Sequence, residues 1–375
     1  GNYSDPSTWS RDSYGGPPSP DAPHKPTDIV HIGDNKEVTL NSAPSSSVSS
    51  MLIELEDPAN PGVEVPGTFT IAGDYVITGD SLKLQENCQI NIAHTEGIAE
   101  TDVTGAIQTT VTRDFNQNAT YKYFFNGDQI TGDGLPSITK ELIVGNAGAG
   151  SNTHLDLSKN LQIDQILTIN NGTFDLNDFS LQGSGPGKTL DMTQEEAELY
   201  ITGPEFPIYF TPQVFTHGTI TYGGSASSQI ATDNSGDNSV LGYKNLKIAS
   251  SSPRTGNIEF ETTGDINVSD IFDISDLNFA APLNNRWSTR NSTFVFNGSG
   301  NQDIPTRPGG HTDLGVFLEY GNLRLETGGI KSLNDATPVA QATVLNDLTI
   351  NTGTTLSLNV SNLEVQENWD NNDGY

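Results

Sequence analysis

Short apolar doublets recur along the chain, each with one polar residue between two apolar ones. Five follow one another between residues 155 and 181: Leu155-x-Leu157, Leu161-x-Ile163, Leu167-x-Ile169, Phe174-x-Leu176 and Phe179-x-Leu181. Successive side chains of a strand point to opposite faces, so each doublet predicts a very short strand with one apolar face. The doublets begin six, six, seven and five residues apart, which leaves no room for crossover helices. A chain that turns this often while keeping one face apolar predicts an all-β parallel β-solenoid.

Longer phrases also return, which indicates a repeat protein built from degenerate modules. Leu167-Thr-Ile-Asn-Asn-Gly-Thr173 reappears as Leu348-Thr-Ile-Asn-Thr-Gly-Thr354, and the phrase Asn126-Gly-x-Gln129 is echoed around Gln229 and Gln302. The intervals between the glutamines are 100 and 73 residues (229 minus 129, and 302 minus 229). Several coils therefore form one module, and insertions vary its length. Stacked ladders of Asn and Gln amides between coils are an expected reason for the recurrence.

The pattern divides the chain into four segments. They are an irregular N-terminal segment or cap at 1–27, the first coils at 28–92, an insertion or junction at 93–118, where the doublets are lost, and a solenoid of degenerate modules at 119–375. Trp9 is expected to cap the open end of the core, and the solenoid is expected to continue beyond Tyr375. One short helix is predicted over 192–199, because Thr193 and Glu196 have the spacing of a capping box.

Composition narrows the function classes. The chain has 375 residues with 33% hydrophobic residues, 38 glycines and 20 prolines, which suits a thin core with many turns. Its net charge of -30 disfavours nucleic acid and anionic membranes as partners. The sequence contains no run of 18 apolar residues, so no membrane-spanning helix is predicted. No signal sequence is evident at Gly1, so the chain is interpreted as a mature or trimmed polypeptide.

Cys88 is the single cysteine, so no internal disulfide forms. It lies among apolar strand positions, where a small apolar residue would pack, and a structural role is expected rather than a reactive one.

Paired carboxylates are the first candidate for catalysis. The pairs are Glu54 with Glu56, Asp265 with Asp270, and Asp273 with Asp276. Glycosidases need two carboxyl groups that face one sugar, and parallel β-helix lyases need a basic residue beside a calcium cluster. Outward positions of a solenoid are mostly polar, and the few basic residues are scattered singly, so solvated strand faces explain these pairs better. We therefore expect no catalytic residue and no enzyme.

Metal and phosphate sites have little support in the pattern. The six histidines show no pair at metal-ligand spacing on one strand or helix: His24, His31, His94, His154, His217 and His311. Calcium held by Asp28, Asp34 and Asn35 at the first turn is an alternative to the absence of any cofactor. Residues 183–189 resemble a phosphate loop, but Gln182 stands where the motif requires glycine, and Pro186 lacks an amide N–H. A turn between coils is expected there.

The N-terminal aromatic residues have two interpretations. Tyr3, Trp9 and Tyr14 form either an end cap for the core or a strip that docks a partner. Partner-binding residues are otherwise not assigned.

Several of these phrases together resemble a known family. They are Asp5-Pro-Ser-Thr-Trp9, Asp28-x-Val30-x-Ile32, Asn126-Gly-x-Gln129-x-Thr-Gly132 and Leu167-Thr-Ile-Asn170. The combination resembles the repetitive N-terminal regions of large surface proteins of Bacteroidota that the type IX secretion system exports, including gliding-motility adhesins. The resemblance spans nearly the whole chain. It implies a right-handed parallel β-helix with irregular insertions, a secreted protein on the exterior of the outer membrane, and no catalytic residues.

The expected function is that of a cell-surface adhesin or elongated spacer, which serves gliding motility or attachment to surfaces and polysaccharide. Its expected partners are extracellular surfaces or polysaccharide and, during export, the type IX translocon, which residues 1–27 are hypothesised to contact. The alternative is a β-helix polysaccharide lyase or glycoside hydrolase.

Overall fold

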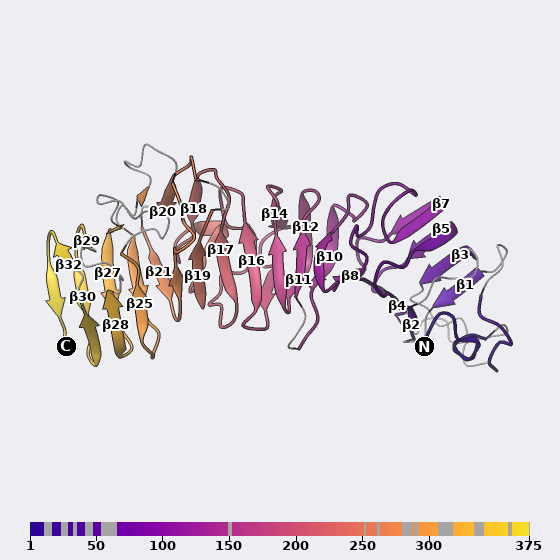
Figure 1. Ribbon diagram of the computed structural model, residues 1–375, viewed down its shortest axis with the longest axis horizontal. Helices are drawn as coiled ribbons and strands as arrows, with labels where there is room; N and C mark the ends of the chain where they lie inside the picture. The colour runs from indigo at the N-terminus through magenta and orange to yellow at the C-terminus, as the bar shows by residue number, and fades with distance from the viewer. Residues whose placement is uncertain are drawn as a thin grey trace. The chain divides into compact units, whose positions relative to one another are not determined.

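The computed structural model describes most of the chain. The described residues are 1–10, 17–23, 29–32, 36–41, 48–53, 66–148, 152–250, 253–260, 263–279, 287–288, 292–306, 318–333, 341–358 and 362–374. They form 33 strands and two short 3₁₀-helices, Pro6–Thr8 and Gly236–Asn238. The strands are nearly all parallel and wind into a β-solenoid of about 11 turns, which confirms the predicted fold class (Figure 1). The right-handed winding stays a prediction.

The first of two compact units contains residues 1–175 and 179–193. Its strands are β1 Ile29–Ile32, β2 Glu37–Leu40, β3 Val48–Ile53, β4 Thr68–Ile71, β5 Ile77–Leu84, β6 Gln89–Ile92, β7 Ile107–Phe115, β8 Thr120–Tyr123, β9 Gly127–Ile130, β10 Ile138–Val144, β11 Thr153–Asp156, β12 Leu161–Ile169, β13 Gly172–Asp175, β14 Leu181–Gly183 and β15 Thr189–Met192. One sheet has the order β1-β3-β5-β7, and a second runs from β2 through the even-numbered strands to β14, with β15 also on β12. β9, β11 and β13 lie side by side in a third. A strand in the middle of a sheet thus pairs with strands of the coils before and after it.

The second unit contains residues 176–178 and 194–375. Its strands are β16 Ala197–Ile201, β17 Thr219–Tyr222, β18 Ser228–Ile230, β19 Asn245–Ile248, β20 Ile258–Phe260, β21 Asp265–Val268, β22 Phe272–Asp273, β23 Trp287–Ser288, β24 Thr293–Phe296, β25 Gln302–Ile304, β26 Glu319–Tyr320, β27 Asn322–Leu325, β28 Gly329–Leu333, β29 Gln341–Val344, β30 Leu348–Ile350, β31 Thr354–Ser357, β32 Asn362–Val365 and β33 Trp369–Asn371. They pair in the orders β16-β17-β19-β22, β18-β20-β23, β21-β24-β27-β30-β33, β25-β28-β31 and β26-β29-β32.

Inward side chains stack in columns from one coil to the next. In the first unit Phe69, Ile90, Tyr121, Leu142 and Leu167 occupy equivalent positions of neighbouring strands, and all are fully buried. A slip by one residue would turn every one of these side chains to the outer face. The apolar column therefore fixes the register between coils.

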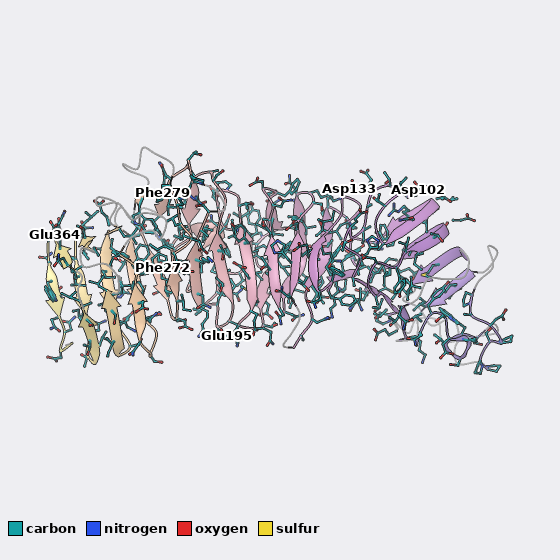
Figure 2. The ribbon with its side chains drawn as sticks, in the orientation of Figure 1. Asp102, Asp133, Glu195, Phe272, Phe279 and Glu364 are labelled. Carbon is teal, nitrogen blue, oxygen red and sulfur yellow. The ribbon has the colours of Figure 1, made fainter. Side chains whose placement is uncertain are left out.

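The core of the second unit contains a cluster of aromatic rings. Phe294 lies with its ring centroid 4.9 Å from Phe260, 5.4 Å from Phe272 and 5.0 Å from Tyr320. Figure 2 shows Phe272 among the strands, whereas the exposed Glu195 lies at the outer surface of the same unit. These rings supply much of the apolar area that this unit buries.

The recurring glutamine of the modules is buried and bonds the backbone of the preceding coil. Gln129 Nε2 donates to the carbonyl oxygens of Ile92 at 3.0 Å and of His94 at 2.9 Å, and its Oε1 accepts from the Phe125 N–H. The side chain thereby satisfies the carbonyls of one corner and the amide of the next. The expected stacking of glutamine amides on one another is not how Gln129 is used.

Gln302 repeats this arrangement in the second unit. Its Nε2 donates to the carbonyl oxygens of Val268 at 3.0 Å and Asp270 at 2.9 Å, and its Oε1 accepts from the Gly298 N–H at 2.9 Å. The glutamine that recurs in the sequence at these two positions therefore makes the same hydrogen bonds at the corner of two different coils. Gln229 differs, because its side chain is only half-buried and Ser228 beside it is the buried residue.

One amide-to-amide contact between coils, and not a continuous ladder, occurs at the asparagine of the repeated Leu-Thr-Ile-Asn phrase. Asn351 Nδ2 donates to Glu326 Oε2 at 3.3 Å, and its Oδ1 accepts from Asn372 Nδ2 at 3.4 Å. At the equivalent Asn170, Oδ1 accepts from Thr193 Oγ1 at 2.9 Å. These contacts link a corner to the coils beside it.

Two cations are fully buried in the second unit and are bound mainly by carbonyl oxygens. Lys331 Nζ donates to Gly298 O at 2.6 Å, Gly300 O at 3.2 Å and Gln302 Oε1 at 2.7 Å. Burial lowers the pKa of Lys331 to about 8. Burial of a charged group has a desolvation cost, which the contacts of Lys331 with carbonyl oxygens offset.

Arg254 is the second buried cation. One of its terminal nitrogens donates to Ala226 O at 2.6 Å and Ser228 Oγ at 3.0 Å, and the other donates to Gly223 O at 2.6 Å. Its Nε is buried without a hydrogen-bond partner, and burial lowers its pKa to about 10.

One sequence prediction about local structure is wrong. The helix over 192–199 is absent, since Met192 ends β15 and Ala197 begins β16, with a turn closed by the Ala197 N–H on Gln194 O. The alternating burial of Ala197, Leu199 and Ile201 is a period of two, and it prevails over the capping-box spacing.

The segment at 93–118, expected to be an insertion or junction, contains the strand β7. Its residues 107–115 pair with β5 and extend the first sheet. Threonine-rich residues favour strands without forming apolar doublets, and Thr109 is buried in place of an apolar side chain. The doublet criterion therefore missed this strand.

The N-terminal residues pack against the first coils. Asn2 bridges to Thr39 of β2, and Tyr3 is buried with its ring 5.3 Å from Trp9 and 6.5 Å from Phe69. Trp9 Nε1 donates to Tyr3 O at 2.8 Å. Tyr3 thus fills the core position, and Trp9 covers it. Tyr14 lies outside the described residues.

Phe294→Ala tests the aromatic cluster. Loss of a ring that contacts Phe260, Phe272 and Tyr320 should lower the free energy of unfolding by about 3–5 kcal/mol, measured by urea unfolding followed by circular dichroism. The matched control is Asp303→Ala at an exposed strand position, which should change it by less than about 0.5 kcal/mol. Equal effects of both variants would contradict this account of the core.

Lys331 should make stability depend on pH in a defined window. Its pKa of about 8 lies below the ordinary 10.5, so between these values the unfolded chain binds more protons than the folded chain. The free energy of unfolding of the wild type should therefore rise from pH 8 to 10.5 relative to a Lys331→Met variant. Urea unfolding at several pH values measures the difference, and Lys83→Met, at an exposed position of β5, is the control. A difference that is flat or falls with pH would refute the assignment.

Candidate functional site

Three side chains with metal-ligating atoms meet on the outer face of the first unit. His154 and Asp156 lie on β11, and Asp175 lies on the adjacent strand β13. One ligand atom from each side chain lies within 4.8 Å of the others. Within the described part of the chain, this is the group in which three or more His, Cys, Asp or Glu side chains lie close enough to share a metal ion.

The local sequence places these residues on one face. Leu155 and Leu157 are fully buried, so His154 and Asp156 must point outward from the same strand. The parallel register then sets Asp156 directly beside Asp175. The three side chains come together because two coils stack in register.

A glycine allows the two strands to approach at the start of β13. Gly172 has φ +97°, and a Cβ atom built there would lie 2.0 Å from the Thr153 carbonyl oxygen. Any other residue would push the corner of this coil away from β11. Gly172 therefore helps to set the position of Asp175 beside Asp156.

The cluster is partly exposed and its charge is predominantly negative. His154 Nε2 lies 3.0 Å from Asp156 Oδ1, with the two side chains 42% and 35% exposed. This distance is that of an ion pair, but the contact lacks the geometry of a hydrogen bond, and the buried Oδ1 has no hydrogen-bond partner. Asp128 of β9 stands opposite His154 on its other side. An imidazole nitrogen and two carboxylates form a mixed N/O donor set.

The sequence search missed this cluster because it looked for pairs of histidines on one element. A usable signal was present. Alignment of the doublets that begin at Leu155 and Phe174 also aligns the residues that follow them, Asp156 and Asp175, and places His154 on the same face.

The predicted carboxylate pair Asp265 and Asp270 is divided between two ion pairs. Asp265 Oδ2 lies 2.5 Å from an Arg324 terminal nitrogen, and Asp270 Oδ2 lies 3.1 Å from Lys244 Nζ. Each carboxylate is held by its own cation instead of facing a shared substrate position.

The pair Asp273 and Asp276 shares one cation. Lys247 Nζ lies 3.8 Å from Asp273 Oδ2 and 2.5 Å from Asp276 Oδ2, and the Asp276 contact is the main cause of the raised pKa of Lys247. Both carboxylates therefore contact the same lysine instead of facing a shared substrate position. The third pair, Glu54 and Glu56, lies outside the described residues.

Among the residues that the structure describes, the other predicted candidates do not assemble into a site. His94 Nδ1 accepts from the Glu96 N–H, and His217 Nδ1 contacts Thr216 Oγ1. His31 is exposed on β1. Outside the described residues lie His24, His311 and the calcium candidates Asp28, Asp34 and Asn35.

The loop that resembles a phosphate loop connects β14 to β15, which both pair with β12, so it is a turn within one coil and not the expected turn between coils. Ser184 Oγ donates to Asp164 Oδ1 at 2.6 Å, and Lys188 Nζ lies 3.3 Å from the same oxygen. The Ser184 hydrogen bond is the main cause of the lowered pKa of Asp164. The lysine of the motif is therefore engaged by a carboxylate of the neighbouring coil.

The fold defines the chain as a parallel β-solenoid repeat protein. Comparison with protein-family models, curated proteins and solved structures found no match. Across the described ranges no helix is both long and apolar enough to cross a membrane.

Cys88 should be unreactive in the folded chain. Its side chain is fully buried, and burial raises its pKa. Ellman's reagent should therefore label less than about a tenth of the thiol in the native protein within minutes, and one equivalent in guanidinium chloride. Rapid stoichiometric labelling of the native chain would contradict the structural role predicted for this residue.

Proposed function

We propose that the chain is part of a secreted cell-surface adhesin, in which the solenoid also serves as a spacer. The observation that carries this proposal is the repetition of polar groups on the outer faces at the spacing of the coils. The resemblance of its phrases to type IX-secreted, gliding-motility adhesins of Bacteroidota supports the same class.

The outward columns of the second unit illustrate this repetition. Thr219 and Asn245 are in register on neighbouring strands, as are Arg324 and Thr349. Neighbouring rungs lie about 4.8 Å apart. A polymeric ligand that extends along several coils would meet a polar side chain at successive rungs.

Such a surface favours many weak contacts over one deep site. Linked weak interactions raise the overall affinity for a polymeric or surface-bound ligand far above that of one contact. Exposed acids such as Asp133 and Glu195 (Figure 2) and the net charge of -30 favour neutral polysaccharides over acidic ones. We therefore name neutral polysaccharide as the preferred class of ligand.

The lyase or glycosidase alternative makes a different prediction for the same experiment. The carboxylates that the structure describes in the predicted pairs are held by lysine or arginine. This arrangement favours binding over acid catalysis. The fold itself does not distinguish the two classes.

The test combines retention and product release. The full chain is incubated with insoluble neutral polysaccharides and with soluble acidic and neutral glycans, and bound protein, reducing ends and unsaturated products are measured. We expect retention on at least one insoluble neutral polysaccharide, loss of retention in an excess of its soluble form, and no product. Product release would contradict the proposal and support the enzyme. Absence of retention on every polymer would contradict the adhesive role.

Export is a separate element of the proposal. We infer passage through the type IX secretion system, with residues 1–27 in contact with the translocon during export. Pull-down of translocon components by this segment, with a scrambled segment as the control, tests the contact, and equal recovery by both would contradict it.

A further inference from the structure

We propose that His154, Asp156 and Asp175 bind one divalent transition-metal ion on the outer face of β11 and β13. This inference goes beyond the adhesive function and does not depend on it.

The spacing of the donor atoms suits a single ion. The three ligand atoms lie within 4.8 Å of one another. Zinc lies about 2.0–2.2 Å from nitrogen and oxygen ligands in a tetrahedral arrangement, so its ligand atoms are about 3.4 Å apart. Small rotations of side chains that are only partly buried close this difference.

The electrostatics of the cluster also favour a cation. Asp156 and Asp175 are directly opposite each other on paired parallel strands, where like charges destabilise a sheet. Asp128 adds a third carboxylate beside His154. A divalent ion between the carboxylates would convert this repulsion into attraction.

An independent observation comes from the hydrogen bonds of Asp156. Its Oδ1 atom is buried from solvent and has no hydrogen-bond partner, which is rare for a carboxylate oxygen in a folded protein. Asp164 contrasts with it, because Oδ1 of that residue accepts from Ser184 and contacts Lys188. Asp156 Oδ1 instead lies 3.0 Å from His154 Nε2, a separation close to that of two ligand atoms on one metal ion.

The donor set selects the class of metal. Imidazole nitrogen favours zinc, nickel, copper and related ions, whereas calcium and magnesium prefer oxygen ligands alone. Water molecules would complete the coordination, since the His154 and Asp156 side chains are 42% and 35% exposed. The ion would connect two coils and stabilise the folded chain, because the unfolded chain does not hold the ligands together.

The experiment uses the whole chain, purified without a polyhistidine tag and freed of metal by a chelator. Calorimetric titration with ZnCl2 should give one equivalent bound at a site that calcium and magnesium fill at least tenfold more weakly. Zinc should also raise the midpoint of thermal unfolding. Cobalt(II) should produce visible absorption bands characteristic of nitrogen and oxygen ligands.

Variants assign the site to these residues. Asp175→Asn and His154→Gln should each weaken zinc binding at least tenfold, whereas His217→Gln, which changes an exposed histidine outside the cluster, should leave it unchanged. Circular dichroism confirms that each variant is folded.

A second measurement needs no variant. Zinc should protect His154 of the wild-type chain from diethylpyrocarbonate, while His217 stays reactive, as mapped by mass spectrometry. Zinc binding that persists in both variants without protection of His154 would show diffuse binding to an acidic surface and overturn the proposal. Absence of stoichiometric binding would overturn it as well.

Discussion

The carbonyl groups at the corners of each coil impose the constraint on which this fold depends. Strands satisfy their backbone groups by pairing with neighbouring coils, but a corner carbonyl that points into the core has no water to bond and is costly to leave unpaired. The following coil supplies a long donor in each case described: the amides of Gln129 and Gln302, the guanidinium of Arg254 and the ammonium of Lys331. The core must therefore contain polar side chains at the corners, and the register between coils places each of these donors beside its carbonyl oxygen.

These donors link neighbouring coils in addition to the strand pairing between them. Gln302 bonds the carbonyls of Val268 and Asp270 in the preceding coil, and its own Oε1 accepts from Lys331 of the following coil. Removal of either side chain would leave buried groups of two coils without partners, which is more costly than the loss of one bond. The local stability of such a stretch is therefore that of a network, superimposed on the nearest-neighbour stacking usual for solenoids.

The sequence predicted the parts of the fold that apolar periodicity controls. Doublets such as Leu155-x-Leu157 mark an inward face directly, because burial and period two coincide there. The strand β7 was not predicted, because Thr109 is buried without being apolar. The helix predicted over 192–199 was wrong, because capping-box spacing is a local signal and the stacking of coils overrides it. The buried state of Lys331 could not be predicted, because a lysine is normally exposed and its acceptors Gly298 and Gly300 belong to another coil. Likewise, the His154 cluster depends on the register between coils, which no single strand reveals.

The division between inward and outward positions explains how chemistry can arise on this fold. Inward columns and corner donors hold the coils, so outward residues are constrained mainly by solubility. Two outward residues one coil apart become neighbours whatever their identity, as Asp156 and Asp175 do across 19 residues of sequence (175 minus 156). In the second unit, some outward acids have a basic residue of a neighbouring coil beside them, as Asp270 has Lys244, and the two charges compensate each other. At His154, by contrast, the neighbours are two carboxylates, so negative charge is concentrated at one place. Ligands that a rigid sheet holds close together form a preorganised cation site.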